Sequence, residues 1–246
     1  MNGPLIHCFE RYRMVRCLTS PLPSEPPLPL EYHPVSWDFD SLLLRRAAHV
    51  IWSSFRGTTD TVVLPLLATP EGCLQTMRAI AQHRHFLPFA TWLIRCSSDR
   101  FATCRSSDGP STDSQLATRT VHDGTERSLT QRVFRTTWVT MENSSSIPSP
   151  EPDPNEYCAT IQALYDPVRH CAAIQNVAVL PDHRRRGLAT WLLWRAARSC
   201  QILGFDRITL EATVGNTPAI RLYVENGFRV EQTILRSVPT SCTKPI

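Results

Sequence analysis

The most informative segment of this chain is Leu180-Pro-Asp-His-Arg-Arg-Arg-Gly-Leu-Ala189, which joins two different hydrophobic patterns. Before it, residues 171–180 form a short apolar run of the kind that makes a buried strand. After it, small and apolar residues recur at helical spacing over residues 187–203, and Gly204 then supplies a C-cap. A second strand pattern follows at Arg207–Thr213. Together these patterns predict two parallel strands joined by a crossover helix.

The start of the predicted helix has the chemistry of a phosphate-binding site. The first N–H groups of a helix lack intrahelical partners, and the helix dipole places about half a positive charge there. Gly187 lets the backbone approach an anion closely, and Ala189 keeps the next turn slim. Each of Arg184, Arg185 and Arg186 either contacts phosphate or stays solvated. The sequence contains neither G-x-G-x-x-G nor G-K-[ST], so a dinucleotide fold and a P-loop are not predicted.

Composition limits the class of protein. The chain has 246 residues, of which 42% are hydrophobic and 20% charged, and its net charge is +4. No apolar run approaches the ~18 residues that span a bilayer, and the N-terminus lacks the pattern of a secretory signal. We therefore expect a cytoplasmic protein without membrane contact. The net charge is too small and too scattered to favour nucleic acid as a partner.

The cysteines and histidines do not predict a metal site. The nine cysteines include no C-x-x-C pair, so we expect reduced thiols that fill small apolar spaces. His83 and His85 have no cysteine or carboxylate partner nearby in the sequence. We predict that the protein works without a metal.

The N-terminal half divides into an arm and part of a folded domain. Six prolines between residues 19 and 34 predict that residues 1–36 form an extended, Pro-rich arm. Residues 37–105 carry the N-terminal part of the fold. Their patterns predict a helix over 38–54, a strand over 59–67, a helix that Thr69 caps and Pro70 opens, and a strand over 89–96.

The C-terminal half divides into an insertion and a core. Residues 106–155 are rich in Ser, Thr, Asp and Pro, which predicts a mobile surface insertion. Within it, residues 130–140 could add an edge strand. Residues 156–240 form the core, where strands over 157–164 and 171–180 make a hairpin before the crossover unit.

Two motifs in this core resemble a known family. Arg184-Arg-Arg-Gly-Leu-Ala189 is similar to the R/Q-x-x-G-x-G/A signature of the GNAT superfamily of N-acetyltransferases. Leu210-Glu-Ala-Thr-Val-Gly-Asn216, Ala219 and Leu222-Tyr-Val-Glu-Asn-Gly-Phe228 resemble a pattern of ribosomal-protein N-terminal acetyltransferases. The close match covers residues 173–228. The resemblance implies an α/β (mixed α+β) fold with a central mixed, splayed β-sheet flanked by helices.

The resemblance also implies a function. The chain would bind acetyl-CoA and transfer the acetyl group directly, in a ternary complex, to a primary amine of a small molecule or a protein N-terminus. The pantetheine arm of acetyl-CoA would bond the backbone of the strand that ends at Val179, and an N–H of this strand would polarise the thioester. The diphosphate would bind the amides of residues 185–190. The implied cofactor-binding residues are Val177, Ala178, Val179, Arg184, Arg185, Arg186, Gly187, Leu188, Ala189, Thr190 and Asn216.

Two side chains of the second motif receive catalytic roles from the resemblance. Tyr223, on a helix that Thr217 caps and Pro218 opens, would protonate the departing sulfur; otherwise it is a half-buried aromatic. Glu211 would act as the base through a water, because its ordinary pKa of about 4.3 is far below that of an alkyl amine, about 10.4. Otherwise Glu211 is a strand carboxylate paired with an arginine. Asn216 binds cofactor amides or serves as a turn residue.

Two departures from the family pattern limit these assignments. Many relatives have an acidic residue where this chain has Gln175 and Asn176, which leaves the base open and keeps a non-catalytic acyl-CoA sensor as the alternative function. Residues 229–238 leave room for one further strand where relatives often have two, so we expect a more open acceptor side. The sequence identifies neither the acceptor nor an oligomeric state.

Overall fold

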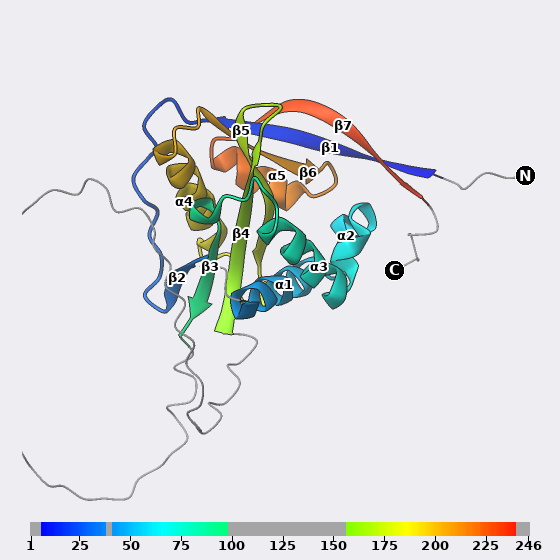
Figure 1. Cartoon of the computed structure of the whole chain (residues 1–246), viewed down its shortest axis with the longest axis horizontal. Coiled ribbons are helices and arrows are strands. Elements are labelled where there is room, and N and C mark those ends of the chain that lie inside the picture. The colour runs from blue at the N-terminus through cyan, green and yellow to red at the C-terminus, as the bar shows by residue number, and fades with distance from the viewer. Residues whose placement is uncertain (1–5, 38–40, 98–155, 240–246) are drawn as a thin grey trace, which may run out of the picture. The chain divides into compact units, whose positions relative to one another are not determined.

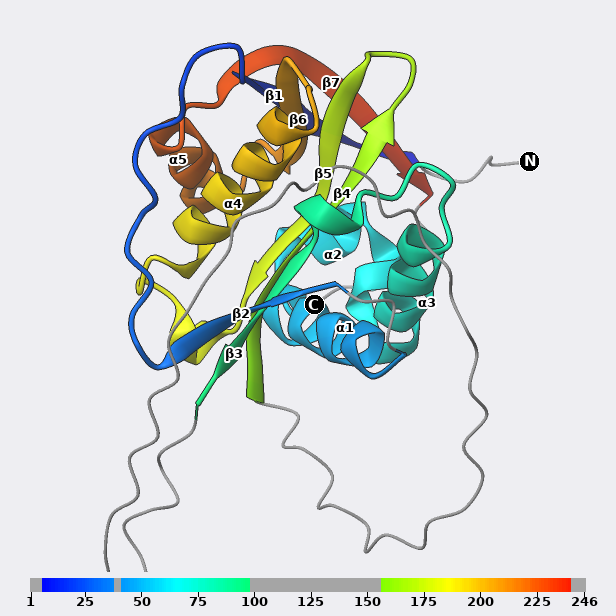
Figure 2. The ribbon, with the colours of Figure 1, turned by 60° about the vertical axis from the view of Figure 1, so that its left-hand side comes forward.

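The computed structural model describes residues 6–37, 41–97 and 156–239, which form a mixed sheet with helices on both faces (Figures 1 and 2). Within these ranges the seven strands lie in the order β2-β3-β4-β5-β6-β1-β7. Of the strand pairs that the structure describes, β5 and β6 are parallel and the others antiparallel. The strands are β1 (Ile6–Cys17), β2 (Tyr32–Ser36), β3 (Trp92–Cys96), β4 (Tyr157–Asp166), β5 (Cys171–Val179), β6 (Arg207–Thr213) and β7 (Arg229–Pro239). The predicted fold class is confirmed.

Helices cover the sheet in two groups, as Figure 2 shows. The two groups lie on opposite faces of the sheet, and the core fills the space between each group and the sheet. The first group comprises α1 (Ser41–Phe55), α2 (Thr59–Val63) and α3 (Pro70–Ala81), and the second α4 (Leu188–Ile202) and α5 (Thr217–Glu225).

Several local predictions are confirmed. The hairpin of β4 and β5, the helix α4 and the strand β6 lie where the patterns placed them. In α3, the side chain of Thr69 accepts a hydrogen bond from the Gly72 N–H (3.1 Å), as an N-cap does. At the end of α4, Gly204 adopts a φ of 83°, which favours glycine.

The predicted arm over residues 1–36 is wrong at residues 6–17 and 32–36, which form strands. Residues 6–17 form β1, which lies inside the sheet between β6 and β7, and residues 32–36 form the edge strand β2. The Pro-rich stretch between them packs along α4. It provides hydrogen-bond acceptors for two buried tryptophans, since Trp194 Nε1 donates to the Pro23 carbonyl (2.8 Å) and Trp191 Nε1 to Glu25 (3.0 Å).

The predicted strand over residues 59–67 is also wrong, because this run folds as α2 and a 3-10 turn, Pro65–Ala68. The apolar, β-branched composition favoured a strand, but Pro65 lacks the N–H that a strand ladder needs. Tertiary contacts override the propensity, because the side chain of Asp60 bonds to Thr213 on β6. The possible edge strand over residues 130–140 lies outside the described residues.

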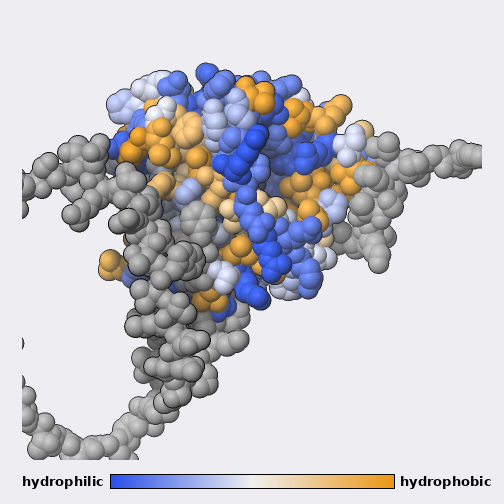
Figure 3. Space-filling model, in the orientation of Figure 1, coloured by the Kyte–Doolittle hydropathy of each residue, from blue (hydrophilic) through white to orange (hydrophobic). Residues whose placement is uncertain are grey.

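The described surface is mixed in character. In the orientation of Figure 1, hydrophilic and hydrophobic residues lie side by side (Figure 3). Of the helices that the structure describes, none is long and apolar enough to cross a membrane.

Candidate functional site

The splay of β5 and β6 opens a cleft in the sheet. Their parallel pairing is confined, among the described residues, to Ala172 with Ile208 and Ala173 with Thr209. Beyond this point β5 continues to Val179 with β4 on one side only. A cleft of about 590 Å³ opens there, lined by the α1–α2 segment, the end of β5, the start of α4 and the helix α5. The free side of β5 therefore offers backbone groups to a ligand.

Most of the residues that the sequence singled out meet in this cleft. Arg186 and Glu211 are not among the lining residues. The predicted residues that do line it are Val177, Ala178, Val179, Arg184, Arg185, Gly187, Leu188, Ala189, Thr190, Asn216 and Tyr223.

The turn that leads into α4 is shaped for an anion. Arg185 and Gly187 adopt left-handed φ angles of 62° and 81°, and no side chain caps the helix. The N–H groups of the first turn therefore remain available to a ligand in the cleft. A Cβ on Gly187 would lie 3.9 Å from the Pro27 carbonyl oxygen, an ordinary contact. Backbone conformation, and not space within the protein, is what favours glycine here.

The three arginines of this turn differ in what they contact. Arg184 donates from Nε to the Val179 carbonyl (3.2 Å) and from Nη2 to the Ser54 carbonyl (3.0 Å), so it holds the turn against β5 and α1. Arg186 lies 3.9 Å from the Glu31 carboxylate and is half exposed. Arg185 lines the cleft and, within the described part of the chain, makes no hydrogen bond or ion pair. It is the arginine best placed to meet a phosphate.

Tyr223 lies in the same cleft, on the buried side of α5. Its side chain is 9% exposed and packs edge-on against Phe228, with ring centroids 6.1 Å apart. Burial raises the pKa of the Tyr223 hydroxyl above its usual value of about 10; Asp60 raises the pKa further, and Arg11 opposes this. The hydroxyl thus stays protonated at neutral pH and can serve as a proton donor.

Asp60 is a cleft residue that the sequence analysis missed. It lies on α2 and is 7% exposed. Thr213 Oγ1 donates to its Oδ1 (2.6 Å), and Asn216 Nδ2 donates to its Oδ2 (2.7 Å). Aspartate is depleted in strands, so an acidic residue inside a β-branched run was a signal against the strand prediction.

Asn216 connects this carboxylate to α5. Its side-chain oxygen accepts from the Ala219 N–H (3.2 Å), so Asn216 is the N-cap, one residue before the predicted Thr217. Its amide nitrogen is committed to Asp60. Both functional atoms of Asn216 therefore bond the protein itself.

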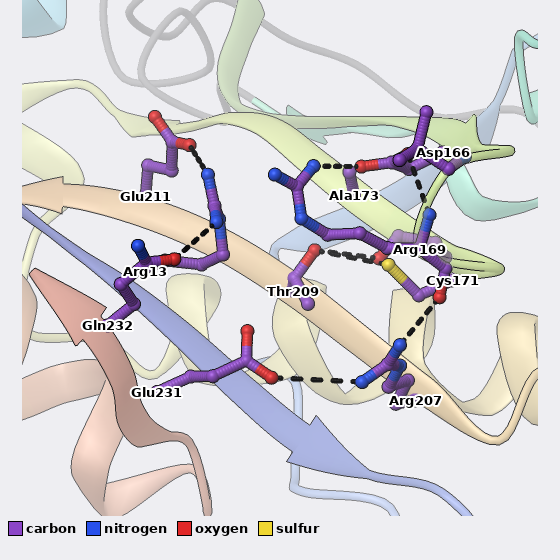
Figure 4. Close-up of polar contacts among 12 residues, drawn as sticks. Arg13, Asp166, Arg169, Cys171, Ala173, Arg207, Thr209, Glu211, Glu231 and Gln232 are labelled. Atoms are coloured by element: carbon purple, nitrogen blue, oxygen red, sulfur yellow. Dashed lines mark hydrogen bonds and ion pairs between the residues drawn. The ribbon is translucent and has the colours of Figure 1, made fainter. Parts of the chain in front are cut away.

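Glu211 faces a network of arginines. Arg13 Nη2 lies 3.3 Å from its carboxylate, and Arg11 Nε lies 3.9 Å away. Figure 4 shows Arg13 between Glu211 and Gln232, which accepts from Arg13 Nη1 at 2.9 Å. Of the two alternatives for Glu211, the contacts match the strand carboxylate paired with arginine.

The cleft also contains an unsatisfied polar atom. Ser54 is 7% exposed and lines the cleft, yet its hydroxyl has no hydrogen-bond partner within the described residues. A buried polar group without a partner is costly, so a ligand that bonds it would gain affinity. Across residues 6–37, 41–97 and 156–239, no group of three or more His, Cys, Asp or Glu side chains could hold a metal ion.

Comparisons with known proteins agree on one family. Residues 116–228 match the family model described as the acetyltransferase (GNAT) family. A 58-residue stretch is 38% identical to the chloroplastic GCN5-related N-acetyltransferase 4 of Arabidopsis thaliana, covering 24% of this chain and 20% of that protein.

Two solved structures share the fold. A GCN5-related N-acetyltransferase from Sphaerobacter thermophilus superposes with a TM-score of 0.52 at 15% identity, over 96% of this chain and 52% of the other. A Drosophila protein superposes with a TM-score of 0.53 at 13% identity, over 97% and 53%. The chain spans about half the length of either structure.

Proposed function

From the premise that this chain carries a domain of the acetyltransferase (GNAT) family, we propose that it transfers an acetyl group from acetyl-CoA directly to a primary amine. The observation that carries the proposal is the cleft where β5 and β6 separate. It combines an uncapped helix start with a protonated, buried tyrosine.

The residues present fit acetyl-CoA as a substrate. The first-turn amides of α4 and the side chain of Arg185 would bind the diphosphate. The free backbone edge of Val177, Ala178 and Val179 would bond the pantetheine amides, as an added strand does. Acetyl-CoA supplies an activated thioester. The protein would orient it and stabilise the charge that develops on its oxygen, through a backbone N–H of Val177 or Ala178.

Tyr223 would donate a proton to the departing sulfur. Burial keeps its hydroxyl neutral, which is the state that a general acid needs. Among the described residues, no cysteine lines the cleft, and the Ser54 hydroxyl there has no hydrogen-bonded base. Transfer would therefore proceed in a ternary complex, without an acyl-enzyme.

Calorimetry with CoA and a thiol-release assay test the proposal. The wild-type protein should bind CoA, and it should release CoA thiol from acetyl-CoA with at least one member of a panel of peptides, polyamines and aminoglycosides. Failure to bind CoA would refute the proposal. CoA binding without thiol release on any amine would favour the alternative, a non-catalytic acyl-CoA sensor.

A further inference from the structure

We infer that Asp60 forms the acceptor subsite: its carboxylate binds the protonated amine and removes the proton that the amine must lose before it attacks the thioester. This inference rests on the proposed function. It assigns the base to a residue on α2, whereas the family resemblance pointed to Glu211 on β6.

The position of Asp60 in the cleft suits an acceptor subsite. Among the described residues that line the cleft, Asp60 is the one acidic side chain that is buried. Glu225 also lines the cleft, but it is exposed and pairs with Arg221 at 3.2 Å. Glu211 lies outside the lining and contacts Arg13. A buried carboxylate interacts with a cation more strongly than an exposed one, because solvent screens it less.

Two hydrogen bonds fix the orientation of the Asp60 carboxylate. Each oxygen of the Asp60 carboxylate accepts one hydrogen bond, from Thr213 on β6 and from Asn216 at the start of α5. A carboxylate oxygen can accept two, so each keeps a free acceptor position. An ammonium group has donors alone, which makes it the complementary ligand. The fixed partners hold the carboxylate in place before any ligand binds.

Asp60 also lies near Tyr223, the proposed acid. Asp60 raises the pKa of Tyr223, so the two groups are close enough to interact electrostatically. Asn216 also links Asp60 to the helix that carries Tyr223. The cleft therefore places a proton acceptor and a proton donor on two different elements, as transfer between an amine and a thioester requires.

The cation that interacts with Asp60 comes from β1. Arg11 on β1 is the nearby cation; burial lowers the pKa of its guanidinium, while Glu211 and Asp60 raise it. Arg236 on β7 is a second cation that acts on Arg11. Glu211 holds Arg11 and Arg13 by ion pairs and a backbone bond. Glu211 is thus already paired with two arginines, whereas each oxygen of Asp60 accepts one hydrogen bond and can accept a second.

The proton balance of the reaction is complete with these two residues. Asp60 takes one proton from the ammonium group and later releases it to solvent. The neutral nitrogen attacks the thioester carbon, so a C–N bond forms and the C–S bond breaks. Tyr223 gives its proton to the sulfur and takes the second proton from the nitrogen. The third hydrogen stays on the nitrogen as the amide hydrogen. The products are the acetylated amine, CoA thiol and one proton.

The test compares Asp60→Asn with matched acidic controls. Asp60→Asn keeps the size of the side chain and removes its charge, Asp60→Glu keeps the charge, and Glu231→Gln removes a surface acid that pairs with Arg207 at 3.7 Å. Glu211→Gln tests the rival base. For each variant, CoA affinity is measured by calorimetry, and kcat and KM for an amine that the wild type accepts are measured from pH 6 to 10.

Asp60→Asn should bind CoA within twofold of the wild type while kcat/KM at pH 7 falls about 100-fold, a typical loss for a general base. Its residual rate should rise tenfold per pH unit up to the pKa of the amine, because only free amine then reacts. Glu231→Gln should match the wild type. The inference would be overturned if Asp60→Asn bound CoA and kept the wild-type rate and pH profile. It would also be overturned if Glu211→Gln, and not Asp60→Asn, changed the fall in rate that the wild type shows at low pH.

Asp60→Glu keeps the test decisive if Asp60→Asn fails to bind CoA. A carboxylate moved by one methylene should lower kcat and shift the pH at which the rate falls on the acidic side of the profile, while CoA still binds. If neither the rate nor this pH changed, the inference would be overturned. A wild-type protein that binds CoA but acetylates no amine refutes the proposed function, whereas active wild type with active Asp60→Asn refutes the Asp60 assignment alone.

Discussion

The two sides of the cleft are built from different parts of the protein. One side, here the amide wall, consists of residues 177–179 and 185–190, which offer mainly backbone groups. The other side, here the side-chain wall, consists of Asp60, Asn216 and Tyr223, which offer a carboxylate, an amide and a hydroxyl. Backbone N–H and C=O groups can bind a ligand with almost any side chain at the same residue, provided that the chain adopts the conformation that exposes them. Affinity for CoA should thus depend on the amide wall, and turnover on the side-chain wall.

The largest expected effect is on turnover, at the side-chain wall. Tyr223→Phe should lower kcat about 100-fold or more, because it removes the proposed proton donor, and should leave CoA affinity within twofold. Tyr165→Phe is the matched control, since Tyr165 bonds His170 outside the cleft. Steady-state kinetics and calorimetry separate the two effects. A normal kcat in Tyr223→Phe would contradict the acid role.

The next effect is on affinity, at the amide wall. Gly187 and Gly204 have φ angles of 81° and 83° at opposite ends of α4, and Gly187 alone of the two lines the cleft. Replacing either by alanine should cost about 1 kcal/mol of unfolding free energy. Only Gly187→Ala should also raise the Kd for CoA, about tenfold, because its Cβ and its altered turn face the diphosphate. Equal CoA affinities in the two variants would contradict the claim that the amide wall determines the affinity for CoA.

A third effect concerns the buried core at the other end of α4, the helix whose first turn belongs to the amide wall. Burial raises the pKa of the Cys200 thiol on α4 to about 12, from an ordinary value of 9.0. Below pH 9 the thiol is neutral in both states; above it, the unfolded chain ionises and the native protein does not. The free energy of unfolding should therefore fall by about 1.4 kcal/mol per pH unit for this thiol. In urea titrations between pH 8 and 11, the free energy of unfolding should fall less steeply with pH in Cys200→Ala than in the wild type. An equal slope would contradict the raised pKa of Cys200.

The smallest effect distinguishes arginine side chains on the amide wall. Arg185→Ala should raise the Kd for CoA about threefold at low salt, and the difference should shrink as salt screens the charge. Arg198→Ala, which removes an exposed arginine of α4 that bonds Gln201, should not change the Kd. Calorimetry at two salt concentrations measures both. A salt-independent loss in Arg185→Ala would indicate a change of loop structure instead.

The amide wall and two members of the side-chain wall, Asn216 and Tyr223, could be predicted from the sequence, whereas Asp60 could not. The turn before α4 follows from local pattern, since glycine, helix periodicity and flanking strands are adjacent in the chain. Asp60 belongs to a run whose local propensity favours a strand, and its partners Thr213 and Asn216 are about 150 residues away. Local patterns carry no information about such contacts.

Glu211 shows how one missed element affects the interpretation of another. The arginines that contact its carboxylate, Arg11 and Arg13, belong to β1. The prolines after β1 favoured an arm, so the arginine that would pair with Glu211 was not expected to come from this segment. The one C-terminal strand that the sequence allowed is present as β7. The position beside β6 is nevertheless filled, because β1 occupies it.

This placement of β1 constrains how the protein can be made. A ribosome delivers residues 6–17 before either neighbour of that strand, because β6 and β7 lie beyond residue 206. The nascent chain keeps this strand without its sheet neighbours while the residues up to β6 are synthesised, so this part of the sheet closes after synthesis of β7. Such long-range pairing slows folding and leaves the segment open to aggregation, or to a chaperone that masks it.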